Sequence, residues 1–392
     1  MPFDEDKLFN RNYILVCLCN FLFACSFNLI LPVLPLYLTD GLGASKSVMG
    51  IVMACYALAA LIMRPFSGWL VDGLQRKFVF ILCMIPFLLC TVSYVFIMQL
   101  FLIGCMRFMH GLAYGAAGTS ISTIAVDNIP VRKLGTGIGL FGITVSLSMA
   151  VGPMLGMILV DYFPFNQVFM FCFGIACLSF LIGMLIRMPR REIQPRQGGI
   201  KFDDFFLKSG VTAFCSLIMA AFPYGLMLNF ISLYTREHNF DINAGLYFSV
   251  LSIGLVTSRL FSGKLMDRGY VSQVIIGGKI CGVLAFCLFI LAHDVMAFFA
   301  SAIILGLGYG MLSPAYQTMF ILLADENHRG TANSTYFIAW DLSVGISVII
   351  GGLIADWTNL DVTFWCGTGL LVLSIIFFRL VAFRKYKEHH PD

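Results

Sequence analysis

The nine residues RPFSGWLVD at positions 64–72 return in altered form as RLFSGKLMD at positions 259–267. The two stretches are separated by 195 positions (259 − 64). Three glycine pairs share that separation: Gly111 with Gly306, Gly135 with Gly330, and Gly156 with Gly351. Four matches at one spacing are hard to reach by chance. The sequence therefore predicts two homologous halves.

The composition is that of an integral membrane protein. Of the 392 residues, 59% are hydrophobic and 12% are charged, whereas soluble domains carry about 25% charged residues. A soluble fold could not cover this much apolar surface, and large exposed apolar patches aggregate. The 13 cysteines lie in apolar runs without metal-binding spacing, so we interpret them as buried thiols and expect neither a metal nor a cofactor.

Apolar runs of about 20 residues, long enough to cross a bilayer, occur twelve times. Helices are expected because lipid offers no partner to unpaired backbone groups. The predicted fold is an all-α membrane protein with twelve transmembrane helices in two pseudo-symmetric six-helix bundles. The predicted spans are 12–38, 47–71, 78–97, 100–125, 135–160, 166–188, 210–235, 243–266, 272–292, 295–323, 331–355 and 361–382.

The longest hydrophilic stretch divides the chain. We predict an N-terminal bundle over 1–188, a cytoplasmic linker over 189–208 and a C-terminal bundle over 209–392. With the N-terminus in the cytoplasm, every Lys and Arg outside the spans lies on the cytoplasmic side except Lys46 and Arg236. The positive-inside rule therefore predicts that both termini are cytoplasmic. No cleavable signal peptide is expected, because the first apolar run is too long, and we place the protein in a cell membrane, the bacterial inner membrane.

Two motifs carry a resemblance to a known family. The sequence GWLVDGLQRK at 68–77 resembles the signature between spans two and three of the major facilitator superfamily, although Gly73 and Gln75 depart from it. The sequence RFMHG at 107–111 resembles the fourth-span motif of that family, with His110 where Gln is common. The resemblance covers essentially the whole chain. It implies a transporter whose binding site lies near the bilayer midplane between two halves.

Two further stretches resemble the export branches of that family. The sequence SMAVGPMLG at 148–156 is similar to the fifth-span motif associated with antiporters, with departures at Ser148 and Met157. The stretch from Ile30, ILPVLPLYLTDGLGAS, looks like the end of the first span in drug and sugar efflux members. These stretches favour an exporter driven by a proton gradient.

Two ionisable residues are candidates for proton coupling. Asp341 is the one carboxylate placed deep inside a predicted span, where a charge costs several kcal/mol unless it is paired or protonated. It either exchanges a proton, binds a cationic group of the substrate, or forms a fixed salt bridge with a buried arginine. Arg107 lies roughly 12 Å inside the fourth span. The resemblance implies a part in coupling, and a structural hydrogen-bonding role is the alternative.

The loop after span two is the candidate gate. The resemblance implies that Asp72 caps the start of span eleven near Thr331, where a carboxylate is stabilised by the helix dipole. Arg76 is then expected to pair with Asp127. These contacts would hold an outward-open state and break on inward opening.

Further candidates for gating come from the repeat and from span five. Arg64 and Arg259 form a symmetric pair, interpreted as a gate scaffold or alternatively as an anion clamp. Gly152-Pro153 interrupts a helical hydrogen bond and permits close helix approach, with a simple structural kink as the alternative. The complete predicted gating set is Asp72, Arg76, Asp127, Arg64, Arg259, Asp267, Gly152 and Pro153.

Polar and aromatic residues of the cavity-lining spans are the candidates for substrate binding. In the resembling family these are spans 1, 4, 7 and 10. Each candidate has packing as its alternative, and Trp340 could equally face lipid. Lys279 is expected to extend to the cytoplasmic surface. The predicted substrate-binding set is Asn28, His110, Tyr114, Tyr224, Asn229, Tyr309, Tyr316, Gln317 and Trp340.

The leading functional hypothesis is a monomeric, proton-coupled exporter of small organic solutes that works by alternating access. The first alternative is a proton-coupled importer of a small polar solute, because motifs barely encode direction. The second is a non-transporting membrane sensor. An enzyme is not expected, because no metal cluster, phosphate-binding loop or nucleophile–base pair is evident. The expected partners are a small-molecule substrate, protons and the lipid bilayer, and no nucleic acid.

Overall fold

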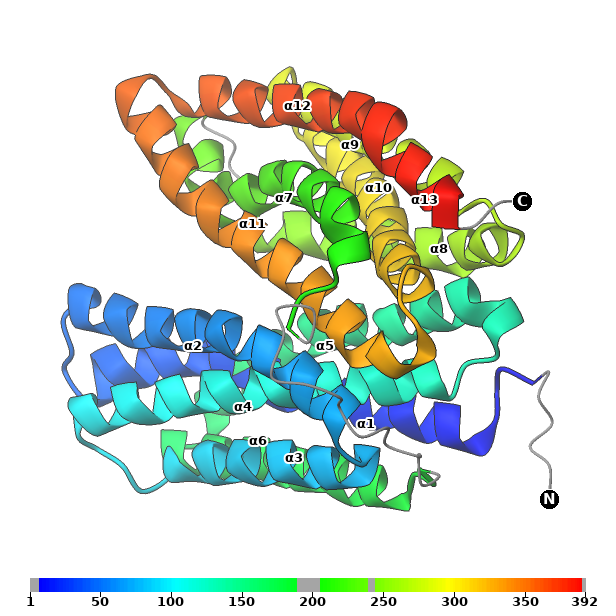
Figure 1. Cartoon of the computed structure of the whole chain (residues 1–392). Helices are drawn as coiled ribbons and strands as arrows, with labels where there is room; N and C mark the ends of the chain where they lie inside the picture. Colours follow the sequence, from blue (N-terminus) through cyan, green and yellow to red (C-terminus); the bar gives the residue numbers. More distant parts are fainter. Residues whose placement is uncertain (1–6, 189–204, 239–243, 390–392) are drawn as a thin grey trace. The chain divides into compact units, whose positions relative to one another are not determined.

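The structure is a computed structural model that describes residues 7–188, 205–238 and 244–389 (Figure 1). Over these ranges every regular element is a helix and no strand occurs. Within these ranges, twelve helices are long and apolar enough to cross a membrane. The predicted all-α transmembrane fold is therefore confirmed. Most of the predicted linker, 189–204, lies outside the described residues.

Twelve long helices follow one another along the described part of the chain. The first six are α1 (Arg11–Leu36), α2 (Lys46–Gly73), α3 (Arg76–Ser93), α4 (Leu100–Asp127), α5 (Leu134–Tyr162) and α6 (Phe165–Leu185). The next six are α7 (Val211–Glu237), α8 (Ala244–Asp267), α9 (Val271–Ile290), α10 (Val295–Leu322), α11 (Arg329–Trp357) and α12 (Leu360–Phe377). A π-helical turn, Phe378–Ala382, joins α12 to the short α13 (Phe383–His389).

Several of these helices begin at a side chain that caps a free backbone N–H group. Asn10 accepts a hydrogen bond from the amide of Tyr13 at 2.8 Å before α1. Asp294 does the same for Ala297 at 2.8 Å before α10. Asn and Asp are favoured at this position because their oxygen satisfies one of the four orphan donors of a helix start. These short polar residues therefore fix where the apolar runs become helices.

The chain divides into two compact units. The first unit holds residues 1–130, 144–206 and 326–334, and the second holds 131–143, 207–325 and 335–392. Two helices are divided between the units. The first ten residues of α5 belong to the second unit, and the first six residues of α11 belong to the first unit.

The same helix pairs recur in the two units. In the first unit α4 packs against α2 and α3, while α6 packs against α1 and α3. In the second unit α10 packs against α8 and α9, while α12 packs against α7 and α9. Each helix pair of the second unit corresponds to a pair of the first unit whose helix numbers are lower by six. This correspondence confirms the internal repeat that the sequence predicts.

Glycines bring the backbones of neighbouring helices into direct contact. A Cβ atom placed on Gly306 of α10 would lie 3.0 Å from the Cα atom of Gly254 in α8. A Cβ atom on Gly308 would lie 2.8 Å from the carbonyl oxygen of Gly278 in α9. Small residues permit this approach in membrane helices, whose association depends on close packing. Helix α10 is therefore held through its backbone on two sides.

Large apolar side chains project from both units. Phe101 is 80% exposed, Met296 82% and Trp357 83%. Such side chains on a soluble surface would promote aggregation, whereas lipid tails accept them. This surface fits a protein embedded in a bilayer.

Candidate functional site

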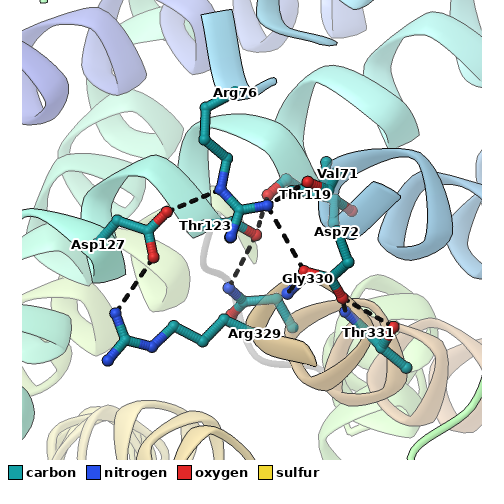
Figure 2. A network of polar contacts seen from close by, with 10 residues as sticks. Val71, Asp72, Arg76, Thr119, Thr123, Asp127, Arg329, Gly330 and Thr331 are labelled. Carbon is teal, nitrogen blue, oxygen red and sulfur yellow. Dashed lines mark hydrogen bonds and ion pairs between the residues drawn. The ribbon is translucent and has the colours of Figure 1, made fainter. Parts of the chain in front are cut away.

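Asp72, at the end of α2, binds the first turn of α11 within the first unit (Figure 2). Its carboxylate accepts hydrogen bonds from the amide of Gly330 at 2.8 Å, from the amide of Thr331 at 2.7 Å and from the Thr331 hydroxyl at 2.9 Å. The Asp72 side chain is only 3% exposed. A carboxylate is stabilised at a helix N-terminus because free N–H groups and the helix dipole converge there. The structure thus contains the cap that was expected near Thr331, and we call this set the α11 clamp.

Asp127, at the end of α4, joins two arginines beside the α11 clamp (Figure 2). The expected pair is present, with 2.7 Å between Arg76 Nε and Asp127 Oδ2. Arg76 also donates to the carbonyl oxygen of Val71 and lies 3.5 Å from the carboxylate of Asp72. Arg329 lies 3.2 Å from the other oxygen of Asp127. Arg329 was missed from the sequence, although its place directly before Gly330 could have suggested it.

An equivalent clamp occurs in the second unit. Asp267, at the end of α8, accepts a hydrogen bond from the amide of Thr136 at 3.1 Å and another from its hydroxyl. Thr136 lies in the first turn of α5. Asp267 follows Asp72 by 195 positions, and Thr331 follows Thr136 by the same number. We call this set the α5 clamp. The residues of the repeat therefore also make equivalent contacts. The shared offset of 195 could have predicted the contact between Asp267 and Thr136.

Arg64 and Arg259 occupy matching positions but donate to different groups. Arg64 donates to the carbonyl oxygen of Gly115 at 3.3 Å and to the Thr119 hydroxyl at 3.5 Å, both in α4. Arg259 donates to the carbonyl oxygen of Gly142, in the part of α5 that belongs to the second unit. Both arginines are buried. The sequence symmetry of the pair therefore does not extend to these contacts.

Gly152 serves close packing between α5 and α1 in the first unit. A Cβ atom at this position would lie 2.7 Å from the Cβ atom of Asn28. Asn28 in turn donates to the Ser148 hydroxyl at 3.0 Å. Pro153 lies within α5, which remains helical from Leu134 to Tyr162. These contacts agree with the packing alternative for Gly152 and Asn28.

Arg107 lies fully buried among aromatic rings in the first unit. Its guanidinium carbon is 4.8 Å from the ring centre of Tyr56 and 5.5 Å from that of Phe27. His110, one turn further along α4, is also fully buried, and its Nδ1 lies 3.1 Å from the Tyr94 hydroxyl. Tyr114 stands beside Phe27, with 4.3 Å between the ring centres. The structure therefore gathers Arg107, His110 and Tyr114 into one group.

Trp340, the residue before Asp341, belongs to a second group of aromatic rings. Tyr224 lies 4.6 Å from Tyr309 and 5.6 Å from Trp340, measured between ring centres. The Tyr309 hydroxyl donates to the carbonyl oxygen of Ala220 at 2.7 Å. Trp340 is therefore part of an aromatic group of the second unit. Asp341 follows it in α11 and is half-buried.

The remaining substrate candidates lie apart from this aromatic group. Tyr316 is fully buried, and its hydroxyl lies 2.7 Å from that of Ser216. Gln317, the next residue, is also buried. Asn229 is exposed and donates to the carbonyl oxygen of Gly225 in its own helix at 2.8 Å. The Asn229 contact lies within its own helix, whereas the Tyr316 contact joins α10 to α7.

The prediction that Lys279 extends to the membrane surface is wrong. Lys279 is fully buried in the second unit. Its ammonium donates to the Ser216 hydroxyl at 2.8 Å, to the Ser374 carbonyl at 2.8 Å and to the Ser374 hydroxyl at 2.7 Å. An ammonium has three donors, and each has an acceptor here. The serines replace the water that a surface position would have supplied.

The comparisons with known proteins agree with this architecture. A family model described as Major Facilitator Superfamily matches residues 16–343 and 273–392. The uncharacterized MFS-type transporter YhhS of Escherichia coli K12 is 23% identical over 400 residues, covering 98% of this chain and 95% of that protein. YhhS of Salmonella enteritidis is 24% identical over 381 residues, covering 94% and 91%.

Solved structures share the fold. The human organic anion transporter MFSD10 superposes with a TM-score of 0.81 at 16% identity, covering 94% of this chain and 98% of that one. The transporter FucP in its outward conformation gives a TM-score of 0.75 at 15% identity, covering 95% and 99%. At these identities the similarity establishes the fold alone. With twelve membrane-spanning helices, an internal repeat and a family model matched over most of its length, the chain belongs to the Major Facilitator Superfamily.

Proposed function

We propose that this transporter exports small organic solutes across the bacterial inner membrane in exchange for protons, by alternating access. The observation that carries the proposal is the position of Asp341. It follows the first residue of α11 by twelve positions, which is about 18 Å along the helix axis. The hydrocarbon core of a bilayer is about 30 Å thick. A carboxylate at such depth is expensive when ionised, which favours a role in binding and releasing a proton.

The surroundings of Asp341 support a solute site beside it. Trp340 stands next in the chain and contacts Tyr224 and Tyr309 through its ring. Aromatic rings offer a large apolar area together with a few polar groups, which is typical of small-molecule sites. We propose that the binding of a solute near Trp340 depends on the charge of Asp341, the next residue of α11. This arrangement would link solute binding to proton release.

The two clamps support a gating role for the helix starts. In the α11 clamp and the α5 clamp a carboxylate from one helix holds the first turn of another through a few polar contacts. Such contacts can be exchanged for water at modest cost, because a hydrogen bond adds only about 0.5–1.5 kcal/mol net and about 1.5–3 kcal/mol when one group is charged. We propose that the clamps are made in one state of the transport cycle and released in another, with Arg76 and Asp127 bracing the first.

The test uses purified protein in proteoliposomes and a solute selected by its ability to raise the unfolding temperature. We expect solute flux that requires a proton gradient in the wild type and is lost in Asp341→Asn. The matched control is Asp356→Asn, which changes an exposed carboxylate in the same helix and should leave the flux unchanged. Gradient-driven flux that persists in Asp341→Asn would overturn the coupling assignment.

The direction of transport has its own test. The solved structures with this fold include one described as a human organic anion transporter and one described as a fucose:proton symporter. Import remains the second candidate because the same groups could serve a symporter. Solute uptake stimulated by an inward proton gradient would favour import, whereas uptake stimulated by a gradient of opposite sign favours export. Absence of any solute flux would favour a sensor.

A further inference from the structure

We propose that Arg107 and His110 bind the carboxylate of an aromatic organic anion within the first unit. The three guanidinium nitrogens of Arg107 form no hydrogen bond of ordinary geometry to the residues that the structure describes, although the Tyr94 hydroxyl interacts with the guanidinium. His110 Nε2 likewise forms no hydrogen bond to the described residues. Both side chains are fully buried. Binding of the anion does not depend on the proposed transport function. Only the further statement that the bound anion is transported rests on that function.

The buried charge of Arg107 calls for an acceptor. A cation removed from water is costly unless it is paired and hydrogen-bonded. Cation–π attraction to the rings of Tyr56 and Phe27 offsets part of this desolvation free energy. The ring centres lie 4.8 Å and 5.5 Å from the guanidinium carbon. The ring faces offer no lone pair to the N–H groups. Within the described part of the first unit no acceptor forms a hydrogen bond of ordinary geometry with the guanidinium, and the proposed acceptor is the carboxylate of a bound anion.

His110 adds a donor of the same kind. Its Nδ1 lies 3.1 Å from the Tyr94 hydroxyl. When that hydroxyl donates to Nδ1, the ring proton lies on Nε2. We assign this tautomer as part of the proposal, so that His110 Nε2 is a donor like the Arg107 guanidinium, as an anion site requires.

The shape of the site favours a carboxylate on an aromatic body. A guanidinium presents parallel N–H groups that match two carboxylate oxygens. Phe27 and Tyr114 lie 4.3 Å apart between ring centres, and Tyr56 and Tyr114 lie 5.5 Å apart. Tyr56 and Tyr114 are half-buried, whereas Arg107 is fully buried. An aromatic acid could displace the two tyrosine rings and take their place against Arg107.

Glycine allows this group to assemble. A Cβ atom at Gly111 would lie 2.9 Å from the Cβ atom of Ala59 in α2 and 3.0 Å from the carbonyl carbon of Tyr56. Helices α2 and α4 therefore touch through their backbones directly beside the site. This contact brings the backbone of Tyr56 close to α4, the helix that carries Arg107 and His110.

The experiment measures thermal unfolding of the purified full chain with benzoate or phenylacetate as probes. Benzamide and phenylacetamide serve as neutral controls of the same shape, and sodium chloride supplies an inorganic anion. We expect the carboxylates to raise the unfolding temperature by several degrees, and the amides and chloride to leave it unchanged. Arg107→Met should abolish the response and unfold at a higher temperature than wild type without ligand, because it removes an unpaired buried charge. Arg268→Met, at an exposed arginine, should retain the response.

Three results would overturn the proposal. One is the absence of any carboxylate effect on the wild type. Another is an equal effect of chloride, which would indicate a site for an inorganic anion. The third is a response that survives in Arg107→Met. Because the measurement needs no proton gradient, carboxylate binding by a protein whose flux does not depend on Asp341 would refute the coupling proposal and leave this site standing.

Discussion

Replacing Asp72 with asparagine should release the first turn of α11. The carboxylate now accepts three hydrogen bonds of 2.7–2.9 Å from Gly330 and Thr331. Asparagine keeps one acceptor oxygen and turns an NH₂ group toward a backbone donor, so at least one charge-assisted bond is lost. That loss is worth about 1.5–3 kcal/mol, and the lost helix-dipole attraction adds about 0.3–1 kcal/mol. The total of about 2–4 kcal/mol favours the released form by between about 30-fold and about 1,000-fold.

Hydrogen exchange read by mass spectrometry measures this release directly. Amides in peptides covering 326–336 should exchange faster in Asp72→Asn than in the wild type, by a factor of that order. The repeat supplies a matched control, because Asp267 holds Thr136 in the same way. Asp267→Asn should accelerate exchange over 131–140 and leave 326–336 unchanged. Unaltered exchange over 326–336 in Asp72→Asn would refute the reasoning, as would equal effects of both variants on both peptides.

Two further predictions concern packing in the spans. Lys279→Met should keep or raise the unfolding temperature in detergent, because Ser216 and Ser374 retain their other hydrogen bonds and an apolar replacement for a buried charge is often neutral or stabilising. Lys279→Ala should lower the unfolding temperature, because it leaves a cavity that costs about 2–5 kcal/mol. A lower unfolding temperature for Lys279→Met than for Lys279→Ala would contradict this account. Gly68→Ala should destabilise the protein by about 1–3 kcal/mol, because its Cβ atom would lie 2.7 Å from the Ser334 hydroxyl. Gly345→Ala should be tolerated, because a Cβ atom there would have nothing within 4 Å. Equal unfolding temperatures for the two alanine variants would count against the close approach of Gly68 to Ser334.

The sequence predicted the spans and the first clamp because both depend on local or repeated signals. Apolar length alone decides whether a segment crosses a bilayer, and all twelve spans follow from it. The contact of Asp72 with Thr331 followed from a motif with a known partner. The α5 clamp around Asp267 and Thr136 needed only the same offset of 195 applied to that contact. Its omission was therefore a missed inference and not a limit of the sequence.

The environment of Lys279 could not be predicted in the same way. In a soluble helix, polar residues mark the face that meets water, so burial follows from periodicity. In a membrane helix, the face toward lipid and the face toward the core are both apolar, and the pattern does not identify the buried side. The serines that receive the ammonium, Ser216 and Ser374, lie in α7 and α12. Only tertiary structure could bring them to one lysine in α9.

The glycine contacts of α10 restrict how the second unit can deform. Sliding α10 by a single residue, about 1.5 Å, would carry Gly306 and Gly308 away from the backbones of Gly254 and Gly278 and bring bulkier neighbours against them. The collisions would occur on two sides at once. Helices α8, α9 and α10 are therefore expected to travel as a single rigid block during transport. Bending is left to segments outside that block, which are where substitutions that alter turnover without altering affinity should be sought.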